Sequence, residues 1–381
     1  MISKALKLWD VHFGNWQSEI EDRRNYRDMA ADEKWGKYWI SFDSVLTLTS
    51  SPHVYCGITS FCAEIFKAYD RTKRSFVDLG YAAIADPFDA KFHRSLLASQ
   101  DGCLYGAIAL LHDVDRYGDA PGGAIVRYNP RNGDIRKIGI PLPHVYIQSL
   151  AIDEERRLAY CQTFTPEYLV SFHLDSGESR ILGLTGSGIG MGQGENIVID
   201  RRGRIWGGWS VTRAWQNEPG IDQHRLYVYD PQAGKIDFLD AGLPHLNGRP
   251  GYAHLDGMIA AADGRLYAGS SEGGLVRIDP DSRKVELLGA PVPPARIAAF
   301  AMGPDGDLYG IGGRYGNASL FRLELKTGKY SMVGKIVDSE TGVSPWQIHD
   351  MSFAEDGTIF AGENDNPYRS SYLWEIHPEV K

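Results

Sequence analysis

The sequence has 381 residues, and its 43 glycines, 19 prolines and 20 tyrosines are spread along the whole chain. Such a composition is typical of many short strands and turns, and the length fits two average domains or one large β domain. A formal net charge of −9 opposes binding to a phosphate backbone, so we expect no nucleic-acid partner. The sequence contains no run of 18 apolar residues, so we expect no membrane-spanning segment either.

The N-terminal residues show no unbroken apolar segment of the kind that begins a secretion signal. We therefore expect a cytoplasmic protein, or a secreted one if a signal was trimmed. The cysteines form no CxxC pair, and three of them lie in apolar, strand-like runs, which predicts reduced and buried thiols. They are Cys56, Cys62, Cys103 and Cys161.

The first predicted element is a strand over Ala5–Val11, where apolar and polar residues alternate. The charged segment from Glu19 to Lys37 follows and predicts a helix or a covering loop, not a second domain. We assign residues 1–38 to this closing strand and its charged extension.

From there on, one pattern recurs: a turn, an aliphatic residue, an aromatic residue and small residues. The aromatic positions are separated by 50, 55, 46, 61, 42 and 51 residues. They are Tyr55, Tyr105, Tyr160, Trp206, Tyr267, Tyr309 and Phe360. A second pattern, strand, Asp-containing turn and strand, follows most copies, as in IVRYNPRNGDIRKIG and LYVYDPQAGKIDFLD, so each repeat has about four strands.

Seven four-stranded units predict an all-β fold, a seven-bladed β-propeller that forms a single domain over residues 1–381. A two-sheet sandwich was the alternative, but it does not require so regular a period. The last unit has only three predicted strands, so we expect the strand Ala5–Val11 to complete it and close the ring.

In a propeller, the first strands of the blades line the central channel, where ligands bind by default. Counting back about twelve positions from each repeat aromatic finds a polar residue in every unit. These are Asp43, His93, Gln148, Glu195, Asn196, His254, Asp256, Arg296, Gln347, His349 and Asp350. They predict either a functional site or a water-filled channel mouth.

The segment GENDNPYRSS, residues 362–371, concentrates polar groups shortly before the last alternating strand. Asn364, Asp365 and Arg369 form either one wall of a polar site or an ordinary solvated loop. HExxH, GxSxG and paired CxxC motifs are absent from the sequence, so metalloprotease, α/β-hydrolase and zinc-ribbon functions have no support.

Two stretches resemble the seven-bladed propeller polysaccharide lyases of the ulvan lyase type, with the related lyases and rhamnosidases that act on rhamnosyl-glucuronic acid linkages. The stretches are DPFDAKFHRSLLASQDGCLYGAIALLH and IHDMSFAEDGTIFAGENDNPYRSSYLW. The resemblance implies β-elimination at a uronic acid in an oligosaccharide or polysaccharide. It implies His93 and His112 as the acid–base pair with a tyrosine as third member. Tyr160 is the first candidate for that tyrosine, because Phe164 stands at the aligned position.

A uronate carboxylate needs charge-assisted hydrogen bonds, for which Arg296, Arg369 and Gln148 are candidates. We add His254, His349, Asn364 and Asp365 as substrate-binding residues. We expect no cofactor to be required for catalysis, while a structural Ca²⁺ or Zn²⁺ in the central channel is left open. The oligomeric state, the exact sugar and endo or exo action are not determined by the sequence.

Two other functions remain open at this point. One is a rhamnosidase-like glycoside hydrolase on the same scaffold, for which Glu195, Asp256 or His53 would be considered; a hydrolase normally needs two carboxyl groups. The other is a propeller that binds sugar without catalysis, because a fold does not choose between functions.

Overall fold

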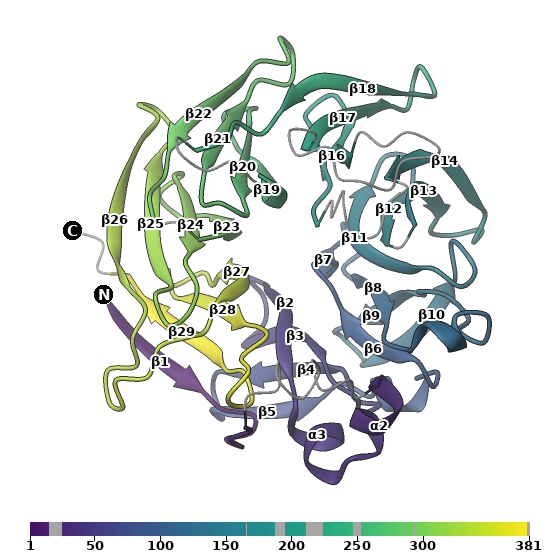
Figure 1. Cartoon of the computed structure of the whole chain (residues 1–381), viewed down its shortest axis with the longest axis vertical. Helices are drawn as coiled ribbons and strands as arrows, with labels where there is room; N and C mark the ends of the chain where they lie inside the picture. Colours follow the sequence, from purple (N-terminus) through teal and green to yellow (C-terminus); the bar gives the residue numbers. More distant parts are fainter. Residues whose placement is uncertain are drawn as a thin grey trace. The chain divides into compact units, whose positions relative to one another are not determined.

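The computed structural model describes residues 1–14, 25–164, 166–186, 195–210, 224–246, 253–292 and 295–378. The chain forms two compact units. Unit 1 comprises Met1–His144, Arg314–Ala318 and Lys335–Lys381, and unit 2 comprises Val145–Gly313 and Ser319–Gly334. Nearly all regular structure in both units is antiparallel β-sheet (Figure 1).

Unit 1 contains a four-stranded sheet in the order β1-β29-β28-β27. A second, nine-stranded sheet consists of two meanders joined by the pairing of Thr59 with Lys91. The strands are β1 Ile2–Leu6, β2 Ser41–Thr47, β3 His53–Thr59, β4 Phe66–Asp70, β5 Ser75–Asp78, β6 Asp89–Phe92, β7 Leu97–Ala98, β8 Leu104–Leu110, β9 Ile125–Asn129, β10 Asp134–Gly139, β27 Ile348–Phe353, β28 Ile359–Glu363 and β29 Leu373–His377. The helices are α2 Tyr26–Ala31, α3 Glu33–Tyr38, η1 Tyr81–Ala83 and η2 Val114–Arg116.

Unit 2 contains four-stranded meanders in which each strand pairs with the next one along the chain. Their strands are β11 Tyr146–Asp153, β12 Leu158–Phe164, β13 Glu167–His173, β14 Ser179–Gly186, β15 Val198–Ile199, β16 Ile205–Ser210, β17 His224–Asp230, β18 Lys235–Gly242, β19 Leu255–Ala260, β20 Leu266–Ser270, β21 Leu275–Ile278, β22 Val285–Gly289, β23 Ile297–Met302, β24 Leu308–Gly312, β25 Ser319–Glu324 and β26 Lys329–Lys335.

The repeated aromatic residues lie on the second strand of each meander, where they are buried. A hydrogen bond explains why an aspartate recurs four residues before many of them. The hydroxyl of Tyr105 donates to Asp101 at 2.8 Å, and in unit 2 the same bond joins Tyr309 to Asp305 at 3.0 Å. A buried tyrosine hydroxyl needs such a partner. The sequence repeat is therefore a repeat of core packing.

Successive four-stranded antiparallel meanders confirm the prediction of an all-β fold of the β-propeller class. The count of seven blades and the single domain stay predictions. All four cysteines are free, and Cys56, Cys103 and Cys161 are buried as predicted. None of the helices in the described part of the chain is long and apolar enough to cross a membrane.

The N-terminal strand pairs with the last strand of the chain, as the sequence predicted (Figure 1). Ile2 lies opposite His377 and Leu6 opposite Leu373. The predicted bounds were wrong, because the strand is β1, Ile2–Leu6, and not Ala5–Val11. Of the charged segment 19–37, residues 19–24 lie outside the described part, and the remainder forms α2 and most of α3.

Deleting residues 1–6 is expected to lower the melting temperature of the full chain markedly. The deletion would expose the ladder edge of β29 and remove the bond from the Ala5 amide to Asp338, 2.8 Å long. Thermal unfolding followed by circular dichroism measures the effect. The control is Lys4→Ala, which removes only the exposed ion pair with Glu340. An unchanged melting temperature after the deletion would contradict a closing role for β1.

Candidate functional site

Polar side chains at the start of several first strands sit on β-bulges. In β27 the register shifts between Ile348 and Asp350, so His349 is the extra residue. In β2 it shifts between Phe42 and Ser44, so Asp43 is the extra residue. Bulges redirect a side chain and are frequent beside active sites. Within unit 2, Gln148 of β11 and Asp256 of β19 occupy the same kind of position.

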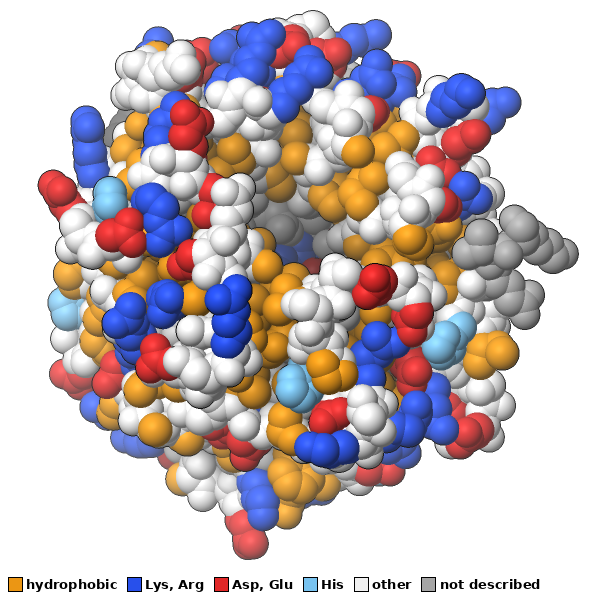
Figure 2. Space-filling view, turned by 180° about the vertical axis from the view of Figure 1, so that it is seen from behind, with side chains coloured by type: hydrophobic (Ala, Val, Ile, Leu, Met, Phe, Trp, Pro, Cys, Tyr) orange, Lys and Arg blue, Asp and Glu red, His pale blue; other side chains and the backbone are white. Residues whose placement is uncertain are grey.

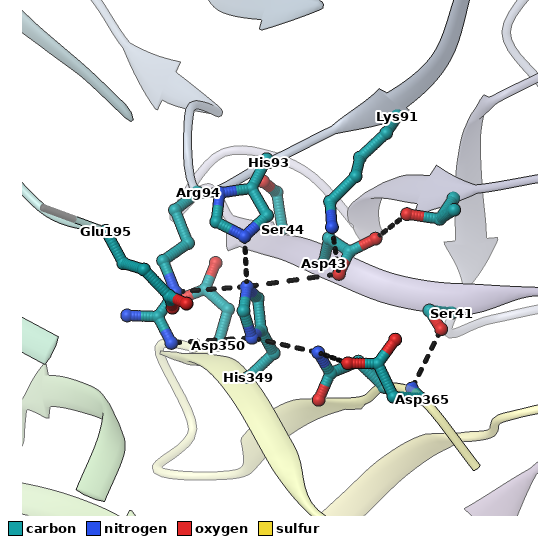
Figure 3. Close-up of polar contacts among 12 residues, drawn as sticks. Ser41, Asp43, Ser44, Lys91, His93, Arg94, Glu195, His349, Asp350 and Asp365 are labelled. Atoms are coloured by element: carbon teal, nitrogen blue, oxygen red, sulfur yellow. Dashed lines mark hydrogen bonds and ion pairs between the residues drawn. The ribbon is translucent and has the colours of Figure 1, made fainter. Parts of the chain in front are cut away.

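The bulges of unit 1 contribute to one buried polar cluster, shown in Figure 3, that we call the histidine cluster. Its members are His93, Arg94, His349, Asn364, Asp365, Asp43 and Lys91. They come from segments far apart in the sequence: β2, β6 and the residues after it, β27, and the residues that follow β28. His93 and His349 are each 2% exposed, and Asp43 is fully buried.

The two histidines face each other directly. Nε2 of His349 lies 3.0 Å from Nε2 of His93, with ring centroids 4.7 Å apart (Figure 3). Nε of Arg94 lies 3.1 Å from Nε2 of His349, and a terminal guanidinium nitrogen lies 3.4 Å from Nδ1. The guanidinium charge beside this ring disfavours a second positive charge on it. We infer that at least His349 is neutral in this arrangement.

Asn364 is oriented by its contacts with His349 and Asp365. Its side-chain nitrogen lies 3.0 Å from Nδ1 of His349 and 3.0 Å from a carboxylate oxygen of Asp365. A flipped amide would turn its oxygen toward the Asp365 carboxylate, so the nitrogen belongs on this side. Nε of Arg94, which can only donate, faces the other ring nitrogen, Nε2. Donor groups therefore approach both ring nitrogens of His349.

The backbone beside these residues adopts left-handed conformations that side chains rarely take. Arg94 has φ of 40° and Asp365 has φ of 51°. The Asp365 amide is fixed by a 2.9 Å bond to the Ser41 hydroxyl, and the Asn364 amide donates to the Gln347 carbonyl at 3.1 Å. Non-glycine residues with positive φ concentrate at functional sites. The cluster is thus held in position by its own loops.

Asp43 is a fully buried carboxyl group of the histidine cluster. It accepts a hydrogen bond from the Thr59 hydroxyl, while Nζ of Lys91 and Nε2 of His349 each lie 3.9 Å from its other oxygen. Burial raises the pKa of Asp43, and the positive charge of Lys91 opposes that shift.

Asp350 is the neighbour of His349 on β27, and its carboxylate turns toward the backbone of β2. It accepts hydrogen bonds from the amides of Val45 at 2.7 Å and Met351 at 2.9 Å. Burial nevertheless raises the pKa of Asp350 to about 6. The folded state therefore binds this proton more tightly than the unfolded state does.

The stability contributed by Asp350 is expected to fall as pH rises from about 4 to about 7. Its folded pKa lies above the unfolded value, so its contribution is complete below the unfolded pKa and is lost through the folded one. Urea unfolding of the parent and of Asp350→Asn across this range measures it, since the asparagine does not titrate. The free energy of unfolding of the parent minus that of the variant should decrease with pH. A difference that stays constant would contradict the raised pKa.

The C-terminal polar segment divides into two parts. Asn364 and Asp365 belong to the histidine cluster, whereas Arg369 makes a two-bond ion pair with Glu363, at 2.8 and 2.9 Å. The Arg369 guanidinium also donates to the Ser370 carbonyl and lies 3.6 Å from the centroid of the Tyr372 ring. These contacts make Arg369 an internal structural residue. Its predicted role in holding substrate is not supported by this geometry and stays untested.

The structure does not bring His93 and His112 together. Phe92 pairs with Ile108 and Asp89 with Leu110, so His93 lies beside the middle of β8 and His112 beyond its end. About five residues of strand, roughly 16 Å, separate the two positions along β8. The Nδ1 atom of His112 contacts the Asp113 carbonyl, and its ring packs against Phe88. This register does not favour a common point for the two side chains, and the paired roles of His93 and His112 stay a prediction.

Tyr160 lies in the hydrophobic core of unit 2. It is 1% exposed, stands 5.9 Å from the ring of Tyr229, and burial raises its pKa above the ordinary range for tyrosine. Gln148 is buried on β11, and His254 precedes β19, where burial lowers its pKa. The proposed roles of these residues stay predictions.

Arg296 forms the centre of a second buried polar group, within unit 2. It makes two hydrogen bonds to Asp256, one of them 2.7 Å long, and a third to Glu195 at 3.3 Å. One guanidinium thus bonds to both carboxyl groups. Arg296 is 5% exposed, so its donors are committed to these acids before any ligand arrives.

Three residues of unit 1 were missed by the sequence analysis. Arg94 and Lys91 flank His93 in the sequence, and that proximity was the available signal. Tyr26 of α2 had no such signal. Burial raises the pKa of its phenol, the positive charge of Lys91 opposes this shift, and the charges of Asp113 and Asp365 add to it. On the face drawn in Figure 2, acidic and basic side chains are intermixed.

No protein-family model matches the sequence, and no curated protein matches it either. Solved structures do resemble the fold at low identity. The extracellular domain of the putative hybrid two-component system BT4673 from B. thetaiotaomicron has a TM-score of 0.59 and 14% identity over 89% of this chain. This chain covers 38% of that chain.

Two solved structures of similar length are lyases. A catalytically inactive virginiamycin B lyase from Staphylococcus aureus, with quinupristin, has a TM-score of 0.60 and 14% identity, over 89% of this chain and 95% of that one. An oligogalacturonate lyase in complex with manganese has a TM-score of 0.56 and 12% identity, over 90% of each chain. At these identities the likeness shows the propeller fold alone.

Proposed function

We propose that the protein is a carbon–oxygen lyase that cleaves a uronic-acid-containing oligosaccharide or polysaccharide by β-elimination. The observation that carries the proposal is the direct contact of His349 with His93, 3.0 Å between Nε2 atoms, in a buried cluster with Arg94. Elimination needs a base for the C5 proton, an acid for the departing O4 and positive charge for the carboxylate. The histidine cluster contains all three.

The two facing imidazoles divide the proton transfers. One ring of the pair removes the C5 proton, and the other ring gives a proton to O4. The C5–H and C4–O4 bonds break and a C4–C5 double bond forms. The proton gained by the first ring then passes to the second across their contact, which restores both neutral rings for the next turnover.

Arg94 and Lys91 supply the positive charge in this scheme. Arg94 is 9% exposed, so its charge acts in a partly desolvated site where charge-assisted hydrogen bonds to a carboxylate are strong. The same guanidinium stabilises His349 while that ring is short of a proton. Arg296, which the sequence suggested for the carboxylate, is not used in this scheme, because it already bonds to Asp256 and Glu195.

Two of the similar structures are named lyases, and one of these is a complex with manganese, which raises the question of a metal here. Within unit 1, His93 and His349 could each offer a ring nitrogen to a metal ion. Arg94 places its positive charge 3.1 Å from one of these nitrogens. The proton relay itself requires no metal ion, and the EDTA arm of the test below decides whether the reaction needs one.

The hydrolase alternative finds little support in unit 2. Glycoside hydrolysis needs one protonated and one ionised carboxyl group. Glu195 and Asp256 share the guanidinium of Arg296, which favours ionisation of both. Non-catalytic sugar binding is separated from the lyase by the experiment below.

The test incubates the protein with a panel of uronic-acid oligosaccharides, with and without EDTA, and follows ultraviolet absorbance from the new double bond. The lyase predicts rising absorbance that persists in EDTA. Reducing ends without absorbance would establish hydrolysis, and binding without cleavage would establish a sugar-binding protein. Activity lost in EDTA and restored by Mn²⁺ would replace the relay with a metal-dependent mechanism.

A further inference from the structure

Unit 1 contains a cavity of about 460 Å³ that none of the proposed chemistry uses. It is formed by the turn after β2, the turn between β7 and β8, and the turn between β9 and β10. We propose that this cavity, the turn pocket, binds a hydroxylated organic anion of monosaccharide size, such as a hexuronate or a hexose phosphate. This inference does not depend on the proposed lyase activity.

The charge of the turn pocket favours an anion. None of its lining residues is acidic, although the protein as a whole carries a net charge of −9. Arg131 and His53 line it, and Nε2 of His53 already lies 3.7 Å from a carboxylate oxygen of Asp70. No described carboxylate lies within ion-pair distance of the Arg131 guanidinium. An exposed arginine with its charge uncompensated at a cavity rim is suited to a carboxylate or phosphate.

The Arg131 side chain lies over Gly102. This glycine has φ of 79°, and a Cβ atom built on it would lie 3.1 Å from a terminal nitrogen of the guanidinium. The exposed guanidinium therefore lies over the turn between β7 and β8, at the cavity. The positive φ of Gly102 favours glycine in this turn.

The remaining lining suits a sugar ring. Serine hydroxyls, among them Ser50 and Ser51, offer hydrogen bonds, while Leu48, Pro52 and Leu104 provide apolar walls. Cavities of about 300–1,000 Å³ with apolar walls and a few convergent polar groups are typical of small-molecule sites. Hydroxyl partners beside one cation match a polyol that carries a single anionic group.

The turn pocket is separate from the histidine cluster. Strand β2 begins at Ser41 and contributes Asp43 to the cluster near this end. It ends at Thr47, directly before the pocket residue Leu48. Five residues of strand between Asp43 and Leu48 correspond to about 16 Å. The two sites thus lie at opposite ends of β2, so binding at each can be measured separately.

Isothermal titration calorimetry on the full-length His349→Gln protein tests the pocket, because this variant weakens the competing site. The probes are glucuronate, glucose 6-phosphate and neutral glucose. We expect saturable binding of at least one anion, at least tenfold tighter than glucose, and a tenfold or greater loss in Arg131→Gln. His53→Gln should also weaken binding. Arg136→Gln is the matched control, because Arg136 is an exposed arginine on the adjacent strand β10 that does not line the cavity.

Each outcome decides the question. Preference for glucuronate identifies a sugar-acid site, and preference for glucose 6-phosphate a sugar-phosphate site. Equal losses in Arg131→Gln and Arg136→Gln would show general electrostatic attraction and overturn the proposal. It would also be overturned by the absence of saturable binding to any probe at tens of millimolar, or by anion binding that Arg131→Gln leaves unchanged.

Discussion

Replacing His349 by glutamine is expected to lower turnover of a uronic-acid oligosaccharide by about 10²–10⁴-fold, the usual contribution of a positioned proton-transfer group. Glutamine preserves much of the side-chain size and hydrogen bonding, so the melting temperature should change by only a few degrees. His93→Gln should give a loss of the same order, because the two rings exchange one proton across 3.0 Å. Initial rates of absorbance increase measure both effects.

The double variant His93→Gln/His349→Gln provides a sharper test of the relay. Residues that act as a unit are strongly non-additive, so the double variant should lose little more than the more damaged single variant. Multiplied losses would show that the two histidines act in independent steps. Near-normal turnover in both single variants would contradict the assignment altogether.

His112→Gln is the matched comparison within unit 1. The sequence resemblance pairs His112 with His93, whereas the register of β6 and β8 places it about 16 Å along the strand. If the structural pairing is right, His112→Gln should retain most of the turnover. A loss as large as that of His93→Gln would restore the pairing that the resemblance implied.

The fold could be predicted from the sequence because the sequence repeat reflects a hydrogen bond that forms within one hairpin. The turn aspartate and the tyrosine four residues later form a hydrogen bond within one hairpin, as in Asp101 and Tyr105, so the period of the bond is visible in the chain. The closing strand was also predictable, because a missing fourth strand in the last unit had to come from elsewhere. The bounds of this strand were harder to predict, because the alternation of apolar and polar residues continues beyond Leu6.

The site was less predictable because its contacts join distant segments. Counting back from the repeat aromatics found Asp43 and His349, but the bulges that turn these side chains are register shifts between paired strands, which a single strand does not show. His93 and His349 are 256 positions apart. Their contact depends on how two sheets of unit 1 pack, whereas the spacing of His93 and His112 along the chain only indicated proximity.

Arg369 illustrates a different difficulty: residues that lie close together in the sequence can belong to two separate groups of contacts in the structure. The loop residues Asn364 and Asp365 join the histidine cluster, and Arg369, four positions later, binds Glu363 instead. Nothing in the order of the residues distinguishes them. The distinction arises because Glu363 ends β28 as a fully buried carboxylate that requires a cation.

Replacing Arg369 by methionine is therefore expected to cost about 3–5 kcal/mol of folding free energy, because it leaves the Glu363 carboxylate buried without its cation. Glu363 also accepts hydrogen bonds from the backbone amides of Trp346 at 2.7 Å and Tyr372 at 2.9 Å. Urea unfolding measures the loss. The control Arg116→Met breaks an exposed ion pair with Asp119 and should cost less than about 1 kcal/mol.

The double variant Arg369→Met/Glu363→Leu then separates the ion pair from the rest of the contacts. Apolar replacement of a buried pair is often neutral when the two charges serve only each other. Here it should remain strongly destabilising, since the amides of Trp346 and Tyr372 lose their acceptor and become buried without a partner. Recovery to the stability of the parent would show that Glu363 does not organise this loop. An Arg369→Met protein that folds normally but loses turnover would instead return Arg369 to the substrate site that the sequence predicted.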